Sequence, residues 1–211
     1  MNRSNTDRTT TGGRPYNPET HRRRSIRLKD YDYSQAGAYF VTICTQERAC
    51  LFGEVVDGEM RLSEAGWMVH AIFEELSVFY SGVDTDAFAI LPNHIHGVIV
   101  LRGTDVVGAT PCGRPDAGQA QGPAPTRLSL PDVVHRFKTL TTKRYADAVK
   151  DCGWPPFAGR IWQHNYYEHI IRNEASLNRI RQYIVDNPAR WAFDRENPDA
   201  VTPELEDRWR T

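Results

Sequence analysis

The chain has 211 residues, of which 40% are hydrophobic and 25% are charged, as is ordinary for a globular protein. No apolar run approaches the roughly 18 residues that a transmembrane helix needs, and residues 1–20 lack the apolar stretch of a signal peptide. The 4 cysteines show no Cys-x-x-Cys spacing, so we expect a protein of a reducing cytoplasm.

The formal net charge of −1 conceals an uneven distribution of charge. Residues 21–29 are strongly basic, although an arginine run near a terminus is also typical of a solvated tail. Because phosphate contact depends on local clusters of charge, a near-neutral total does not exclude a nucleic-acid partner. We expect a disordered basic N-terminal tail at 1–24, a folded domain at 25–194 and an acidic C-terminal tail at 195–211.

The first half of the domain predicts a strand, a hairpin, a helix and two more strands. Residues 38–46 have the β-branched and aromatic content of a buried strand. Asp57-Gly58 lies between two short apolar arms and indicates a hairpin. Ser63 can cap a helix with apolar residues at helical spacing. Its expected apolar residues are Trp67, Ala71, Phe73, Leu76, Phe79 and Tyr80. Residues 86–101 then read as two strands broken by Pro92-Asn93.

The second half predicts two helices separated by a strand. Residues 103–127 are rich in Gly, Pro and Ala, which predicts a flexible insertion. A helix is expected at 129–150, an aromatic, strand-like segment at 161–171, and a third helix at 173–187 that Pro188 closes. This order predicts the α+β class, and we expect a ferredoxin-like antiparallel sheet with helices on one face.

Two histidines in the predicted strand after Pro92-Asn93 point to chemistry. His94 and His96 flank one residue, so both imidazoles project from the same face of the sheet. Burying two unpaired imidazoles is unfavourable, so we expect a ligand or hydrogen bonds there. A lone His-x-His is a weak signal, because solvated or core histidines are common. Nitrogen ligands suit Mn, Zn, Fe or Cu better than Mg.

The third helix offers another ligand and a nucleophile. Tyr183 and Asn187 are four residues apart and therefore lie on one helical face. The Asn187 oxygen can complete a His-His-Asn metal site, with the Tyr183 hydroxyl one turn away. A metal there can orient a phosphodiester for attack by the phenol, which gives a phosphotyrosine ester. The alternative is a tyrosine that merely packs on an amphipathic helix.

Two stretches, LPNHIHGVIVL and IWQHNYYEHIIRNEASLNRIRQYIVDNPARW, resemble the single-tyrosine HUH transposases of the insertion-sequence 200/605 type, and most of all their REP-associated tyrosine transposase branch. The resemblance covers about residues 25–194. It implies a ferredoxin-like fold, His94 and His96 as metal ligands, and Tyr183 as the nucleophile that becomes linked to a 5′-phosphate of single-stranded DNA. Asn187 then completes the metal site, the cofactor is Mg²⁺ or Mn²⁺, and the partner is an imperfect DNA hairpin, such as a repetitive extragenic palindrome, with a short guide sequence.

The other tyrosines and the basic residues extend this expectation. None of the 9 tyrosines are four apart, which favours a single nucleophile. The adjacent Tyr166 and Tyr167 could compete for that role, although we expect these two side chains to be structural. Single-stranded bases could stack on Trp162, Tyr166 or Tyr167, unless these side chains belong to the core. The expected phosphate contacts are Arg22, Arg23, Arg24, Arg27, Arg136, Lys138, Lys143, Arg144 and Arg172.

The residues therefore favour a metal-dependent single-stranded DNA endonuclease and strand transferase. One alternative is a DNA-hairpin binding protein that has lost turnover. Another is a metal-dependent phosphodiesterase that uses water, with Tyr183 only structural. No membrane partner is expected, and the sequence leaves the choice between monomer and homodimer open.

Overall fold

A computed structural model describes residues 27–103 and 128–200 of the chain. The predicted insertion and the arginines Arg22, Arg23 and Arg24 lie outside these residues. The chain divides into two units, residues 1–30 and 31–211, and every helix and strand named below belongs to the second unit. No helix of the described residues is long and apolar enough to cross a membrane.

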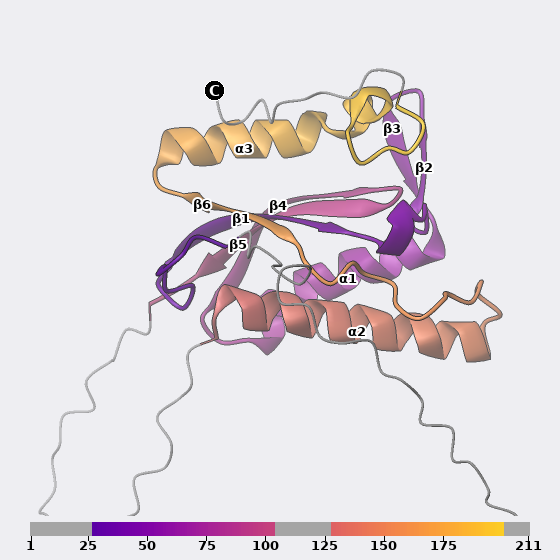
Figure 1. Cartoon of the computed structure of the whole chain (residues 1–211), viewed down its shortest axis with the longest axis horizontal. Coiled ribbons are helices and arrows are strands. Elements are labelled where there is room, and N and C mark those ends of the chain that lie inside the picture. Colours follow the sequence, from indigo (N-terminus) through magenta and orange to yellow (C-terminus); the bar gives the residue numbers. More distant parts are fainter. Residues whose placement is uncertain (1–26, 104–127, 201–211) are drawn as a thin grey trace, which may run out of the picture. The chain divides into compact units, whose positions relative to one another are not determined.

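A four-stranded antiparallel sheet forms the centre of the second unit (Figure 1). Its strands are β1 (Gly37–Cys44), β4 (Val83–Leu91), β5 (His94–Leu101) and β6 (Tyr167–Ile171). Their order across the sheet is β4-β5-β1-β6. Helix α1 (Glu64–Phe79) connects β1 to β4, and helix α2 (Leu130–Asp151) connects β5 to β6. Two interlocked β-α-β units of this kind make a ferredoxin-like sheet, so the predicted α+β fold class is confirmed.

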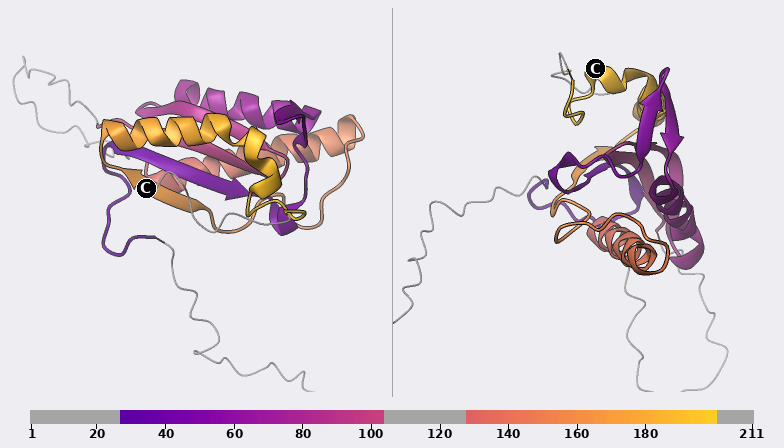
Figure 2. Two further views of the ribbon diagram at one scale, coloured as in Figure 1. Left: turned by 90° about the horizontal axis from the view of Figure 1, so that it is seen from above. Right: turned by 90° about the vertical axis from the view of Figure 1, so that its right-hand side faces the viewer.

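The two faces of this sheet are covered by different helices (Figures 1 and 2). Val41 and Ile95 point toward α1 and α2, in a core with Phe73 and Phe137. Side chains one position along each strand point the opposite way, toward helix α3 (Glu174–Asp186). The residues of this second cluster are Phe40, Val98, Ile171, Ile180 and Ile184.

The expectation of helices on one face is therefore wrong for α3. The central strands β1 and β5 carry apolar side chains on both faces, as a strand does when it is buried from both sides. A second layer must then cover the face opposite α1 and α2, and α3 provides it. His94 and His96 project from this face, so α3 also covers the histidines.

Local sequence signals place α1 against the sheet. The Ser63 hydroxyl accepts a hydrogen bond from the Gly66 amide at 3.1 Å and caps the helix as predicted. Gly97 on β5 lets the helix approach closely, since a Cβ there would lie 2.7 Å from the Phe73 ring. The buried face of α1 differs in part from the predicted one, because Trp67 and Phe79, which were expected to point inward, are each 61% exposed.

The predicted hairpin is formed by β2 (Gly53–Val56) and β3 (Glu59–Leu62). Its turn residues Asp57 and Gly58 have φ of 54° and 80°, the left-handed values that a tight hairpin turn needs. A Cβ on Gly58 would lie 3.4 Å from Cα of Ala189. The hairpin tip thus packs directly against the short 3-10 helix η2 (Pro188–Phe193) that follows α3.

Strand β6 begins later than predicted because a lysine holds the preceding backbone. The Lys138 ammonium donates to the carbonyls of Gln163, His164 and Asn165 at 2.9, 3.2 and 3.1 Å. These carbonyls point at α2 instead of at a neighbouring strand, so regular pairing with β1 starts only at Tyr167.

Helix α3 begins at its cap Asn173 and ends before Pro188, close to the predicted bounds. The Arg181 guanidinium clamps it to strand β4 through two hydrogen bonds to Asp86, of 2.9 and 2.7 Å. This clamp fixes the helix across the sheet face from which the two histidines project.

Candidate metal centre and nucleophile

The imidazoles of His94 and His96 lie side by side on the α3 face of the sheet. Antiparallel pairing places His94 opposite Cys44 and His96 opposite Thr42 on β1. Both residues are buried, with 0% and 4% of their surface exposed. Their Nε2 atoms are 3.1 Å apart.

The tautomer of His94 follows from the side chain before it. The Asn93 amide nitrogen donates to the backbone carbonyls of Arg48 (3.2 Å) and Glu196 (2.7 Å). This leaves the Asn93 oxygen to face Nδ1 of His94 at 2.9 Å. An amide oxygen only accepts, so Nδ1 must carry the proton and Nε2 presents a lone pair. Outer contacts of this type orient metal-binding histidines.

His96 has an equivalent partner on the neighbouring strand. The Thr42 hydroxyl lies 2.9 Å from Nδ1 of His96 and can accept its proton. The Nε2 lone pairs of both imidazoles then face the same point. Two lone pairs 3.1 Å apart repel each other unless a cation lies between them. Neighbouring ligands with metal–nitrogen bonds of about 2.1 Å are separated by roughly this distance.

Burial keeps both imidazoles neutral. Removal from water lowers the pKa of His94 to about 3, and it lowers the pKa of His96 well below the ordinary histidine value. The neutral form is the one that binds a metal, so no proton has to be displaced at neutral pH.

A carboxylate completes a cluster of three possible ligands. One Asp194 oxygen lies 3.7 Å from Nε2 of His94, and this side chain is only 9% exposed. The ligand atoms of His94, His96 and Asp194 all lie within 4.8 Å of one another. Asp194 follows η2 and was missed by the sequence reasoning, because no spacing rule relates it to the histidines. Its only sequence signal is its place seven residues after the predicted ligand Asn187.

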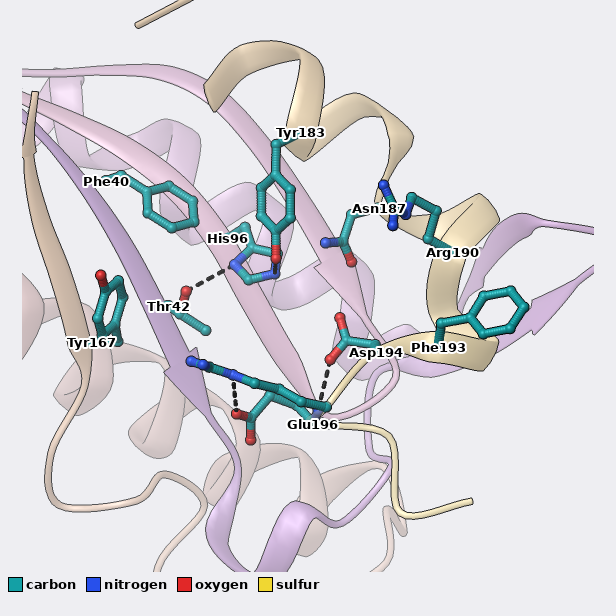
Figure 3. Close-up of a pocket in the computed structure, with 11 residues that line it drawn as sticks. Phe40, Thr42, His96, Tyr167, Tyr183, Asn187, Arg190, Phe193, Asp194 and Glu196 are labelled. Atoms are coloured by element: carbon teal, nitrogen blue, oxygen red, sulfur yellow. Dashed lines mark hydrogen bonds and ion pairs between the residues drawn. The ribbon is translucent and has the colours of Figure 1, made fainter. Parts of the chain in front are cut away.

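Tyr183 and Asn187 reach the same place from α3 (Figure 3). The Tyr183 hydroxyl lies 3.5 Å from Nε2 of His96. The Asn187 side chain is directed toward Asp194, is only 3% exposed, and its Oδ1 atom is buried without a hydrogen-bond partner. A buried oxygen of this kind is unfavourable unless an ion or water satisfies it. The structure thus brings together the four residues that the sequence singled out.

These donors fit a divalent cation. Two neutral imidazole nitrogens and one carboxylate form the cluster, and an unsatisfied amide oxygen lies beside it. Mixed nitrogen and oxygen ligands suit Mn²⁺ and related ions better than Mg²⁺, whose preference is for oxygen.

A pocket opens in front of this cluster. It is lined by Phe40, Thr42, His96, Tyr167, Tyr183, Asn187, Arg190, Phe193, Asp194, Arg195 and Glu196. Arg195 and Glu196, predicted to begin the acidic tail, are thus part of its wall. Of the adjacent tyrosines, Tyr166 is buried in the α1–α2 core, whereas Tyr167 faces the pocket. Tyr167 is therefore a second phenol near the candidate metal centre.

Most predicted DNA contacts lie elsewhere. Helix α2 covers the opposite sheet face from the pocket, and there Lys143 pairs with Asp147 and Arg144 with Glu75. The Arg136 guanidinium stacks on Tyr80, and Lys138 holds the backbone before β6. Arg172 is exposed at the end of β6, and Arg27 belongs to the other unit.

Trp162 does not have a surface available for stacking a base. It is 4% exposed, and its indole nitrogen donates to the Thr141 hydroxyl at 2.7 Å. The expectation of base stacking on Trp162 is therefore wrong, and this side chain belongs to the hydrophobic core instead.

Comparison with known proteins shows what this chain is similar to. No family model matches the chain. A Haemophilus influenzae protein, named only as uncharacterised, is 39% identical over 184 residues, which are 85% of this chain and 96% of that protein. A second protein of this bacterium, assigned by name to the REP-associated tyrosine transposases, is 26% identical over 162 residues, which are 77% of this chain and 76% of that protein.

Two solved structures are also similar. One is a REP-associated tyrosine transposase bound to a REP hairpin, with a TM-score of 0.47 and 17% identity, over 79% of this chain and 74% of that chain. The other, from Deinococcus radiodurans, is assigned as a transposase, with a TM-score of 0.41 and 18% identity, over 77% of this chain and 97% of that chain.

The protein is thus similar in sequence to a protein assigned to the REP-associated tyrosine transposases. It belongs to the same family as the uncharacterised Haemophilus protein, since they share 39% identity over nearly all of that protein's length. The second Haemophilus relative confirms the resemblance to REP-associated tyrosine transposases.

Proposed function

We propose that this protein is a metal-dependent HUH tyrosine transposase, which cleaves and rejoins single-stranded DNA through a 5′-phosphotyrosine intermediate. The observation that carries the proposal is the position of one phenol. The Tyr183 hydroxyl lies 3.5 Å from an imidazole nitrogen of the His94–His96 pair, in a pocket that also holds Asp194 and Asn187.

The metal ligands in this proposal are His94, His96 and Asp194, with the Asn187 oxygen available as a fourth. A bound Mn²⁺ or Mg²⁺ would polarise a phosphate oxygen and offset the charge that develops on it. The chain's own contribution is to hold these donors in one tautomer and one orientation. Asn93 sets both for His94, and Thr42 orients the imidazole of His96.

Tyr183 supplies the nucleophile. Its oxygen forms a bond to the phosphorus, and the bond from phosphorus to the 3′ oxygen of the preceding nucleotide breaks. The phenol proton is lost and the departing 3′ oxygen gains a proton, so the products are a 5′-phosphotyrosine ester and a free 3′-hydroxyl. Because one ester replaces another, the bond can be reversed to join strands without another energy source.

The DNA partner is proposed from the family. A single-stranded substrate with an adjacent hairpin, such as a repetitive extragenic palindrome, fits the relative assigned to the REP-associated transposases. Phosphate contacts by Arg27 and Arg172 remain predictions, and so do those by the α2 residues. The α2 residues lie on the sheet face opposite the pocket, so they can contact only a part of the DNA distant from the cleaved bond.

The proposal is tested with the purified protein, Mn²⁺ and single-stranded oligonucleotides taken from the DNA that flanks its gene. Products are separated on a denaturing gel and scored for a covalent protein–DNA adduct. We expect an adduct with the wild type and none with Tyr183→Phe. The matched control is Tyr167→Phe, which removes the other phenol of the pocket and should leave the adduct.

Other outcomes separate the alternative functions. Cleavage without an adduct, unchanged in Tyr183→Phe, would indicate water as the nucleophile. Hairpin binding with neither cleavage nor adduct would indicate a binding protein that has lost turnover.

A further inference from the structure

The pocket wall beside Tyr183 carries two arginines that the proposed chemistry does not yet use. Arg190 and Arg195 both line the pocket. Figure 3 shows Arg190 at its rim beside Asn187. Arg195 comes one residue after the candidate ligand Asp194, so the backbone that positions the carboxylate also positions this guanidinium.

Arg195 shares the carboxylate of Glu196 with a second arginine. Its Nε donates to one Glu196 oxygen at 3.2 Å, while Arg48 pairs with the other at 3.2 Å. The Glu196 carboxylate is thus divided between two guanidinium groups, and the other acid of the pocket wall, Asp194, is a candidate metal ligand.

The backbone that carries Arg195 is held at several points. The Glu196 carbonyl accepts from Asn93 at 2.7 Å, and the Glu196 amide donates to Asp194 at 2.7 Å. The Asp194 amide donates to the Trp191 carbonyl at 3.1 Å. These contacts fix the start of the Arg195 side chain at the pocket wall, and its Nε contact with Glu196 directs the guanidinium.

We propose that the Arg195 guanidinium binds the phosphate that Tyr183 attacks and stabilises the negative charge of its transition state. The inference rests on the proposed function, because it names a further catalytic residue of the same site. A guanidinium offers a planar pair of N–H donors that matches two phosphate oxygens. Preorganised donors of this type act where charge increases during the reaction.

The first test separates chemistry from binding. Single-turnover cleavage is measured at saturating single-stranded DNA, and the DNA Kd is measured alongside, for the wild type and Arg195→Ala. We expect the cleavage rate to fall about 10²- to 10³-fold. The DNA Kd should change much less, and the Mn²⁺ Kd and Tm should be unchanged. The matched control is Arg179→Ala, an exposed arginine on α3, which should cleave like the wild type.

Two outcomes of this test would overturn the inference. One is a cleavage rate of Arg195→Ala within about threefold of the wild type. The other is a fall in rate that is accompanied by an equal loss of Mn²⁺ affinity, since Arg195 would then act only by supporting the metal site.

A second measurement does not depend on cleavage. Inorganic phosphate should raise the Tm of the wild type and of Arg179→Ala, and it should raise that of Arg195→Ala much less. Equal shifts in all three proteins would overturn the phosphate site. If the wild type forms no adduct but its phosphate stabilisation needs Arg195, the proposed function fails while the phosphate site remains.

Discussion

At the scale of single residues, the site depends on side chains that orient the candidate metal ligands. Asn93 and Thr42 each bond to the Nδ1 atom of one histidine, and through it they determine where the Nε2 lone pair points. Sequence reasoning found the histidines from their spacing. It could not find Thr42, whose role arises only from the pairing of β1 with β5.

Thr42→Val is expected to weaken metal binding while preserving the fold. Valine fills nearly the same space but offers no partner to Nδ1 of His96. Loss of such an outer contact typically lowers metal affinity about 10- to 100-fold. Titration calorimetry with Mn²⁺ measures the change, and Thr139→Val, an exposed threonine on α2, is the control. An unchanged Kd would show that Thr42 does not orient His96.

The third metal ligand is a choice between two residues. Sequence reasoning favoured Asn187, whereas the structure places the Asp194 carboxylate with the histidines. A carboxylate attracts a cation more strongly than an amide oxygen does, so Asp194→Asn should weaken Mn²⁺ binding more than Asn187→Ala. The loss in Asp194→Asn should exceed the roughly 10- to 100-fold effect of an outer contact. The reverse order in calorimetry would restore the His-His-Asn site.

At the scale of elements, capping and turn signals predicted the bounds of most helices and strands. Asp57-Gly58, Ser63 and Asn173 all act at the element ends that the sequence indicated. Two features depended on contacts distant in sequence. The Lys138 ammonium binds three carbonyls of the segment before Tyr167, which was predicted to be part of the strand. Trp67 was expected to point inward from α1, but it is exposed because the buried face of the helix contains Val69 and Ile72.

The Asp86–Arg181 clamp makes the attachment of α3 sensitive to pH. Hydrogen bonds from Arg181 lower the pKa of Asp86 below its usual value. The clamp's stabilisation is thus complete at neutral pH, above the ordinary aspartate pKa of about 3.9, and is lost as the pH falls through the depressed value. Asp86→Asn should therefore melt a few degrees below the wild type at neutral pH.

This Tm difference should shrink in acid, where the wild-type carboxylate is also protonated. Thermal melts of both proteins across this pH range measure it. A Tm difference that stays constant would show that the clamp's charge does not stabilise α3.

At the scale of the whole fold, the two sheet faces have different functions. One face and helices α1 and α2 form the larger core, whereas the other face carries the histidines beneath α3. The sequence predicted the ferredoxin-like order of elements but not that helices cover both faces of the sheet. The reason is that all the helices were expected on one face. Tyr183 and Asn187 reach the histidines because α3 crosses the second face.

The most direct test of the account is to locate the covalent bond. The adduct formed with Mn²⁺ and single-stranded DNA is digested with a protease and a nuclease, and the modified peptide is sequenced by mass spectrometry. We predict a nucleotide 5′-phosphate on Tyr183. A nucleotide on Tyr167, the other phenol of the pocket, would contradict the account, and so would DNA cleavage without any modified tyrosine.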